Sequence, residues 1–74
     1  MPDIHIGKTI LQKLKEKERS IAWLARRISC DDGNLGRQLK NHPHIHSELL
    51  LRISIALEVD FFACYSEKIK ATPK

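Results

Sequence analysis

Residues 20–40 carry two short apolar patterns of helical spacing, separated by a break of only a few residues. The positions concerned are Leu24, Ala25, Ile28, Leu35 and Leu39. We expect Cys30 to fill a small apolar slot within the break. This spacing, two short helices joined by a tight turn, is typical of a helix-turn-helix motif. Such a motif can place its second helix in the major groove of DNA.

The chain has 74 residues, which predicts one domain over residues 1–74. A chain of this size buries only about 60% of the surface that its unfolded form exposes. An enzyme with two lobes around an enclosed cleft is therefore not expected. Hydrophobic residues make up 42% and charged residues 30% of the sequence, a globular composition. Because aromatic residues, Gly and Pro are few, an all-α fold is favoured.

The apolar spacing predicts helices over residues 4–17, 20–28, 32–40 and 47–57, followed by a short fifth helix. Ser20, Asp31 and Ser47 are the expected N-caps, because a short polar side chain accepts a hydrogen bond from an unpaired backbone N–H. Phe61, Cys64 and Ile69 are the residues of the fifth segment expected to join the core. We expect order over about residues 4–70 and a frayed tail over residues 71–74.

The net charge of +4 is unevenly placed. Residues 1–40 hold nine Lys and Arg side chains and five Asp and Glu side chains, while residues 41–74 hold four of each kind. The excess positive charge thus coincides with the two-helix pattern. Clustered basic side chains are typical of nucleic-acid binding, and the alternative is a solvated helix face.

Neither the cysteines nor the histidines form a convincing metal site. Cys30 and Cys64 are far apart in the sequence, and we expect both to be buried free thiols in a reducing cytoplasm. His42, His44 and His46 alternate in a predicted loop, and as metal ligands they would need a fourth ligand and a rigid scaffold. Solvated histidines, no metal and no cofactor are expected. If these histidines approach DNA, their protonation near pH 6 would strengthen binding.

No apolar run approaches the ~20 residues of a membrane span, and no secretory leader is recognisable. We therefore expect a cytoplasmic protein without membrane contact. Catalysis is not expected either, since no Ser or Cys has a His and an acid at a known spacing. The pair Gly33-x-x-Gly36 follows a helix rather than a strand, which is not the context of a phosphate-binding loop.

Several segments together resemble the small bacterial helix-turn-helix domains of the Xre/Cro/phage-repressor type, in particular a compact single-domain subgroup. The resemblance covers about residues 4–67. The matching segments are Ile6-Gly7-Lys8, Ser20-x-x-x-Leu24-Ala25, Leu49-Leu50-Leu51-Arg52-Ile53-Ser54-x-Ala56-Leu57 and Asp60-Phe61-Phe62. It implies a lambda-repressor-like fold of four or five helices that binds operator DNA as a dimer and represses transcription.

The resemblance also implies which residues meet DNA. Asp32, Gly33 and Arg37 occupy positions from which related domains reach base edges, and Asn34 and Lys40 occupy common positions of phosphate contacts. Ser20 lies at the helix start that abuts the DNA backbone. Among the basic residues before it, Arg19 and Lys17 are candidates for further phosphate contacts.

This chain departs from the family pattern on the same surface. Ile21 replaces a frequent Gln, Ser29 replaces the turn glycine, and Gly36 replaces a larger polar residue. The third helix begins Asp31-Asp32 instead of with a neutral polar triplet. Asp31 is expected to act as the N-cap. Asp32 either accepts a hydrogen bond from cytosine N4 or interacts with the positive end of the helix dipole. Arg37 is the expected reader of guanine.

Ile55 is apolar at a position where the family pattern often has Lys or Arg. Phe62 and Tyr65 do not lie on the predicted core face of the fifth helix, which carries Phe61 and Cys64. We expect Ile55, Phe62 and Tyr65 to form a surface for two-fold pairing, and the alternative is that they complete the core. Trp23 is expected to pack over the first helix or the turn, with stacking on nucleic acid as the alternative.

The sequence thus predicts a small dimeric transcriptional regulator that binds duplex DNA by sequence or by shape. The alternative is a protein-interaction module, antitoxin-like or regulator-binding, that has lost base recognition and binds a partner through its last two helices.

Overall fold

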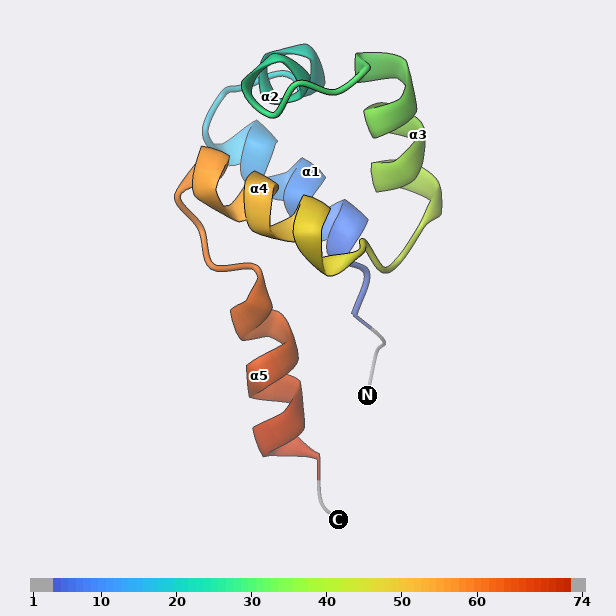
Figure 1. Ribbon diagram of the computed structural model, residues 1–74. Helices are drawn as coiled ribbons and strands as arrows, with labels where there is room; N and C mark the ends of the chain where they lie inside the picture. Colours follow the sequence, from blue (N-terminus) through green and yellow to red (C-terminus); the bar gives the residue numbers. More distant parts are fainter. Residues whose placement is uncertain (1–3, 73–74) are drawn as a thin grey trace.

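The computed structural model describes residues 4–72, and this part of the chain contains five α-helices and no strand (Figure 1). The helices are α1 (Ile6–Glu16), α2 (Ile21–Arg27), α3 (Asp32–Asn41), α4 (Ser47–Leu57) and α5 (Phe62–Ala71). The predicted all-α class is confirmed. Over the described residues, no helix combines the length and the apolar character needed to cross a membrane.

Helices α1 to α4 surround one apolar core, while α5 projects away from them (Figure 1). The largest fully buried side chains are Ile6, Ile10, Leu24, Leu35, Leu39, Leu50, Ile53 and Phe61. No residue of α5 itself is buried. The expected core position of Ile69 is therefore wrong: its side chain is 75% exposed, because α5 has left the helical body at that point. Cys64 is half-buried.

Helix α1 approaches α3 closely at Gly7. A Cβ atom at this position would overlap the backbone carbonyl of Leu39 and lie 3.0 Å from the carbonyl oxygen of His42. The N–H of Ile6 donates to the carbonyl oxygen of Pro43 at 2.7 Å. These contacts fix the C-terminal end of α3 against the start of α1.

The N-caps of α2 and α3 are as predicted. Ser20 Oγ accepts a hydrogen bond from the N–H of Trp23 at 3.0 Å, and Asp31 Oδ2 accepts one from the N–H of Asn34 at 2.9 Å. The predicted cap Ser47 is wrong. His46 caps α4, because its extended backbone lets Nδ1 accept from the N–H of Leu49 at 3.3 Å.

Within two residues after α1, α2 and α4, the chain passes through a left-handed residue that is not glycine: Glu18, Ser29 and Glu58, with φ of 56°, 56° and 57°. After α2, the N–H of Ser29 donates to the carbonyl of Arg26 and the N–H of Cys30 to that of Ala25. This is the Schellman arrangement. It turns the chain sharply between α2 and α3.

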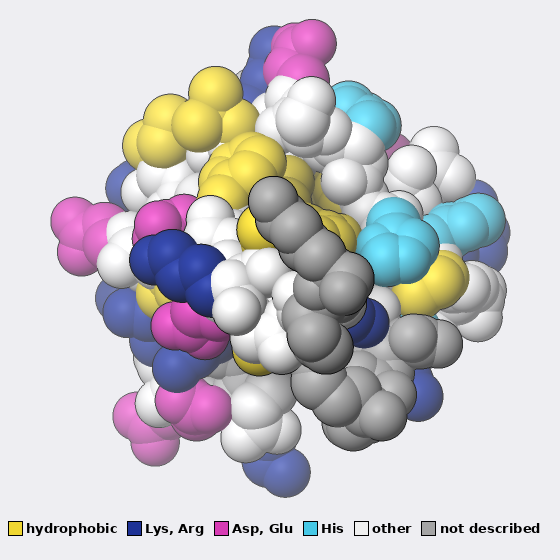
Figure 2. Space-filling model, turned by 90° about the horizontal axis from the view of Figure 1, so that it is seen from below, with side chains coloured by type: hydrophobic (Ala, Val, Ile, Leu, Met, Phe, Trp, Pro, Cys, Tyr) yellow, Lys and Arg dark blue, Asp and Glu magenta, His cyan; other side chains and the backbone are white. Residues whose placement is uncertain are grey.

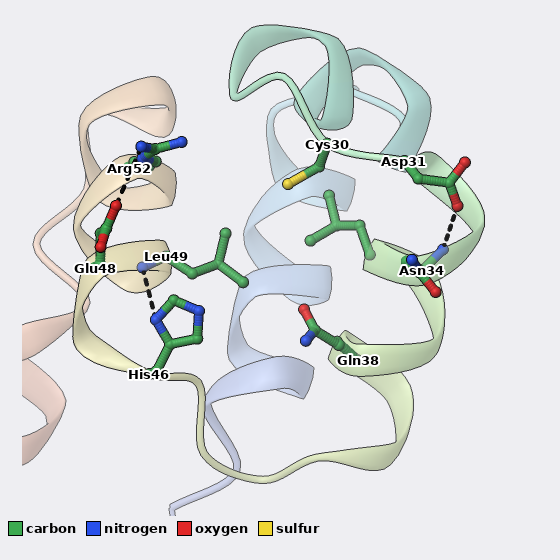
Figure 3. Close-up of a pocket in the computed structure, with 9 residues that line it drawn as sticks. Cys30, Asp31, Asn34, Gln38, His46, Glu48, Leu49 and Arg52 are labelled. Atoms are coloured by element: carbon green, nitrogen blue, oxygen red, sulfur yellow. Dashed lines mark hydrogen bonds and ion pairs between the residues drawn. The ribbon is translucent and has the colours of Figure 1, made fainter.

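The expected burial of Cys30 is wrong for a local reason. Cys30 is exposed rather than buried, since Ile28 fills the core below the turn and the Cys30 side chain is directed into an open groove (Figure 3). The predicted frayed tail begins at Ala71, which is the last residue of α5, and the N–H of Thr72 donates to the carbonyl of Lys68 at 2.9 Å. Residues 73–74 lie outside the described residues.

Candidate nucleic-acid interface

Helix α3 presents a solvent-facing side next to the first residues of α2. The two helices pack against each other and are joined by residues 28–31. A shallow groove runs between them, and we call its lining the α3 outer face: Ile21, Ala22, Asp32, Gly33, Gly36, Arg37, Lys40 and Asn41. Four residues predicted to meet DNA are therefore brought together here, namely Asp32, Gly33, Arg37 and Lys40.

The Arg37 side chain has a defined position although it is exposed. Its Nη2 donates a hydrogen bond to Asn34 Oδ1 at 2.6 Å. The backbone N–H of Asn34 in turn donates to the Asp31 carboxylate. Asn34 thus connects the N-cap of α3 to the guanidinium one turn later. The guanidinium keeps further N–H donors free for a ligand.

Between these side chains the α3 outer face is open. Gly33 and Gly36 leave the helix backbone without side-chain cover, and a Cβ at Gly36 would only reach ordinary contact with Ile21 at 3.8 Å. Arg37 and Lys40 supply two positive charges, against one negative charge from Asp32. The face therefore offers a moderately positive surface with close access to the backbone of α3.

Two other predicted contacts lie elsewhere. Lys17 and Arg19 line a second groove, which we call the Trp23 groove: Lys17, Arg19, Trp23, Arg27, Ile55, Ala56, Leu57 and Glu58. Ser20 lies between the two surfaces, and its hydroxyl oxygen is engaged as the N-cap of α2. The predicted DNA-contacting set is thus divided over separate parts of the surface.

Trp23 packs against the core on one side and under arginine side chains on the other. The guanidinium carbon of Arg19 lies 4.9 Å from the centroid of the indole ring, and that of Arg27 lies 5.5 Å from it. Sequence reasoning missed this arrangement. The four-residue spacing of Trp23 and Arg27 within α2 was the available signal for one contact, because residues four apart are neighbours on a helix. Arg19 precedes the N-cap Ser20, so helical spacing gave no signal for its contact.

A third groove separates α3 from α4, with a volume of about 470 Å³ (Figure 3). Asn34 and Gln38 line it from α3, and the Glu48–Arg52 ion pair, at 3.1 Å, lines it from α4. Asn34 therefore borders this groove while holding Arg37 of the α3 outer face. Along residues 4–72, no three His, Cys, Asp or Glu side chains are grouped to hold a metal ion.

The three residues predicted for two-fold pairing do not share one groove. Ile55 is 69% exposed and lines the Trp23 groove near the end of α4. Phe62 is half-buried against the core. The Tyr65 hydroxyl lies 3.1 Å from Nδ1 of His44, just before α4. Figure 2, which views the end from which α5 projects, shows exposed hydrophobic side chains with histidines beside them.

Two pKa values are displaced in the described part of the chain. Burial, and secondarily the Cys64 side chain, raises the pKa of the Tyr65 phenol above its usual value of 10.0. Hydrogen bonds from Lys13 and Gln12 lower the pKa of Glu16, the last residue of α1, which lines none of these grooves. Neither group belongs to the α3 outer face.

Comparison of this chain with protein-family models, curated proteins and solved structures gives no match. No function can be transferred from a relative. The activity has to be inferred from the side chains that the fold exposes, and among the described residues the α3 outer face combines an exposed helix, a positioned guanidinium and an uncovered backbone.

Proposed function

We propose that this protein binds duplex DNA through the α3 outer face, as a small helix-turn-helix regulator of the lambda-repressor-like type. The observation that carries the proposal is the exposed Arg37 guanidinium, held at 2.6 Å by Asn34. A guanidinium fixed on a solvent-facing helix is suited to a bidentate contact with guanine O6 and N7, which is the commonest specific contact to a base.

The rest of the face suits entry of α3 into a major groove. Gly33 and Gly36 present no side chain to the duplex, so the helix backbone can approach the base edges closely. Lys40, one turn after Gly36, is placed for a phosphate contact, which contributes affinity without sequence information.

Asp32 limits the recognition that this face can achieve. Its carboxylate repels phosphates but can accept a hydrogen bond from cytosine N4. Arg37 is the one cationic side chain placed to contact a base, and the two glycines have no side chain to do so. Direct recognition of base edges therefore extends over few base pairs. DNA shape and deformability would then contribute to the choice of site.

We propose that the regulator acts as a homodimer, with the half-buried Phe62 and Tyr65 at the two-fold interface. Helix-turn-helix dimers bind half-sites about 34 Å apart, one helical turn of DNA, or a multiple of that spacing. Ile55, the third residue predicted for pairing, lies in the separate Trp23 groove and is not part of this proposed interface.

The proposal is tested by titrating the protein into fluorescently labelled random-sequence duplex at several salt concentrations. Because Lys and Arg contacts to phosphates release counterions, log K should fall linearly as log salt rises. Absence of binding at about 50 mM salt, where such electrostatic contacts are strong, would contradict DNA binding. Binding independent of salt would contradict it equally.

A further inference from the structure

The Trp23 groove faces a different direction from the α3 outer face. On α2, Ala22 lines the outer face while Arg27 lines the groove. At 3.6 residues per turn these two positions point about 140° apart around the helix. A duplex on the α3 outer face therefore leaves the Trp23 groove available to another ligand.

The lining of the groove carries more positive than negative charge. Lys17, Arg19 and Arg27 line it, against the single carboxylate of Glu58. Within residues 4–72, the ion pairs are Lys13–Glu16 and Arg52–Glu48, and neither involves the groove. The two guanidiniums rest over the Trp23 ring, an arrangement that holds them in place without a counterion.

The same groove is apolar on its α4 side. Ile55 is 69% exposed, and Ala56 beside it is half-buried. The outer surface of a nucleic-acid backbone is dominated by charged phosphates and offers little apolar surface to cover Ile55. A protein segment with both acidic and apolar side chains can cover it, since its carboxylates can pair with the guanidiniums while an apolar side chain packs on Ile55.

We propose that the Trp23 groove is a docking site for an acidic, amphipathic segment of a partner protein. Arg19 and Arg27 bind its carboxylates, and Ile55 with the edge of Trp23 receives an apolar anchor. The inference goes beyond DNA binding and does not depend on it, because no residue of the α3 outer face takes part.

Trp23 is the only tryptophan of the chain, so its emission reports directly on the groove. The probe is a synthetic peptide designed to place Glu on one helix face and Leu on the other. Its matched control replaces each Glu by Lys. We expect the acidic peptide to change Trp23 emission saturably and the Lys peptide to leave it unchanged.

Paired substitutions locate the binding, with anisotropy of the labelled peptide as a readout independent of Trp23. Arg27→Ala and Ile55→Ser should each weaken binding about tenfold, a loss typical of interface anchors. Arg26→Ala and Leu51→Ser, exposed neighbours that do not line the groove, should change it less than about twofold.

Three results would overturn the proposal: no saturable binding of the acidic peptide, equal losses in Arg26→Ala and Arg27→Ala, or equal losses in Leu51→Ser and Ile55→Ser. A fourth would assign the groove to DNA instead, namely a tenfold loss of duplex affinity in Ile55→Ser. Arg37→Ala serves as the separating control. It should weaken duplex binding while leaving peptide binding unchanged, so the two proposals fail independently.

Discussion

Arg37 is held by Asn34: its Nη2 donates a 2.6 Å hydrogen bond to the Asn34 Oδ1 across one turn of α3. We predict that Asn34→Ala weakens discrimination between preferred and altered duplexes, because the guanidinium loses its fixed orientation. The loss should be part of the roughly 1–3 kcal/mol that a bidentate arginine contact supplies.

A double-mutant cycle on a duplex with a substituted guanine checks this prediction. If Asn34 acts through Arg37, then Asn34→Ala has no further effect on discrimination once Arg37→Ala is present. Additive losses would mean that Asn34 contacts DNA by itself. The backbone N–H bond of Asn34 to Asp31 survives the substitution, so the N-cap of α3 is retained.

Gly7 and Gly36 are both helical, but their surroundings predict opposite results of substitution by Ala. At Gly7 the Cβ overlaps the carbonyl of Leu39, so we expect a loss of at least about 1–3 kcal/mol in the free energy of unfolding. At Gly36 the nearest atom is 3.8 Å away, so the higher helix propensity of Ala should add up to ~1 kcal/mol.

Urea unfolding of both variants measures the difference. Both substitutions replace a helical glycine by Ala, so the opposite signs expected for the two variants report on the contact between α1 and α3 at Gly7. Equal stabilities of Gly7→Ala and Gly36→Ala would mean that this close approach does not exist.

Ser29→Gly should stabilise the fold. Ser29 has φ of 56° after α2, a conformation that costs a residue with a Cβ roughly 1–2 kcal/mol. The greater freedom of glycine in the unfolded chain offsets part of the gain, so we expect an increase of about 0.5–1 kcal/mol by thermal unfolding. In contrast, Ser20→Gly, at an extended N-cap, should cost a few tenths of a kcal/mol. Destabilisation by Ser29→Gly would argue against the left-handed turn.

The raised pKa of Tyr65 predicts a loss of stability at alkaline pH. In the folded state burial disfavours the phenolate, so this contribution is fully present below the usual pKa of 10.0 and is lost as the pH rises through the raised value. Tyr65→Phe should reduce that loss. The measurement compares the unfolding free energy of the two proteins from about pH 8 to about pH 11.

The single tyrosine of the chain gives an independent check. Its phenolate absorbance should titrate at higher pH in the folded protein than in urea. A midpoint at or below 10.0 in the folded state would contradict the prediction.

Features determined by neighbouring residues could be predicted from the sequence. The caps at Ser20 and Asp31 depend on a backbone N–H three residues away, and helical spacing was sufficient to identify buried positions such as Leu24 and Leu39. The same helical periodicity predicts that the side chains of Arg37 and Lys40 lie on one exposed side of α3.

Features determined by packing between helices could not. Ile69 has the spacing of a core residue, but α5 leaves the helical body, and no local pattern encodes that direction. Cys30 is apolar, but the turn directs it into a groove that exists only when α3 and α4 are placed. Arg19 and Arg37 likewise line different grooves, and the groove of Arg19 forms only when α4 places Ile55 beside Trp23.

The most direct test of the central claim compares duplex affinities of the wild type, Arg37→Ala and Lys40→Ala. The duplexes are the preferred one selected from a random pool and its variant with one altered guanine. Lys70→Ala, on the projecting α5, is the charge-matched control. Arg37→Ala should lose about 1–3 kcal/mol of discrimination between the duplexes. Lys40→Ala should weaken both equally and reduce the salt slope by ~1. If Arg37→Ala discriminates like the wild type, or if Lys70→Ala matches the loss of Lys40→Ala, the α3 outer face is not the DNA-binding surface.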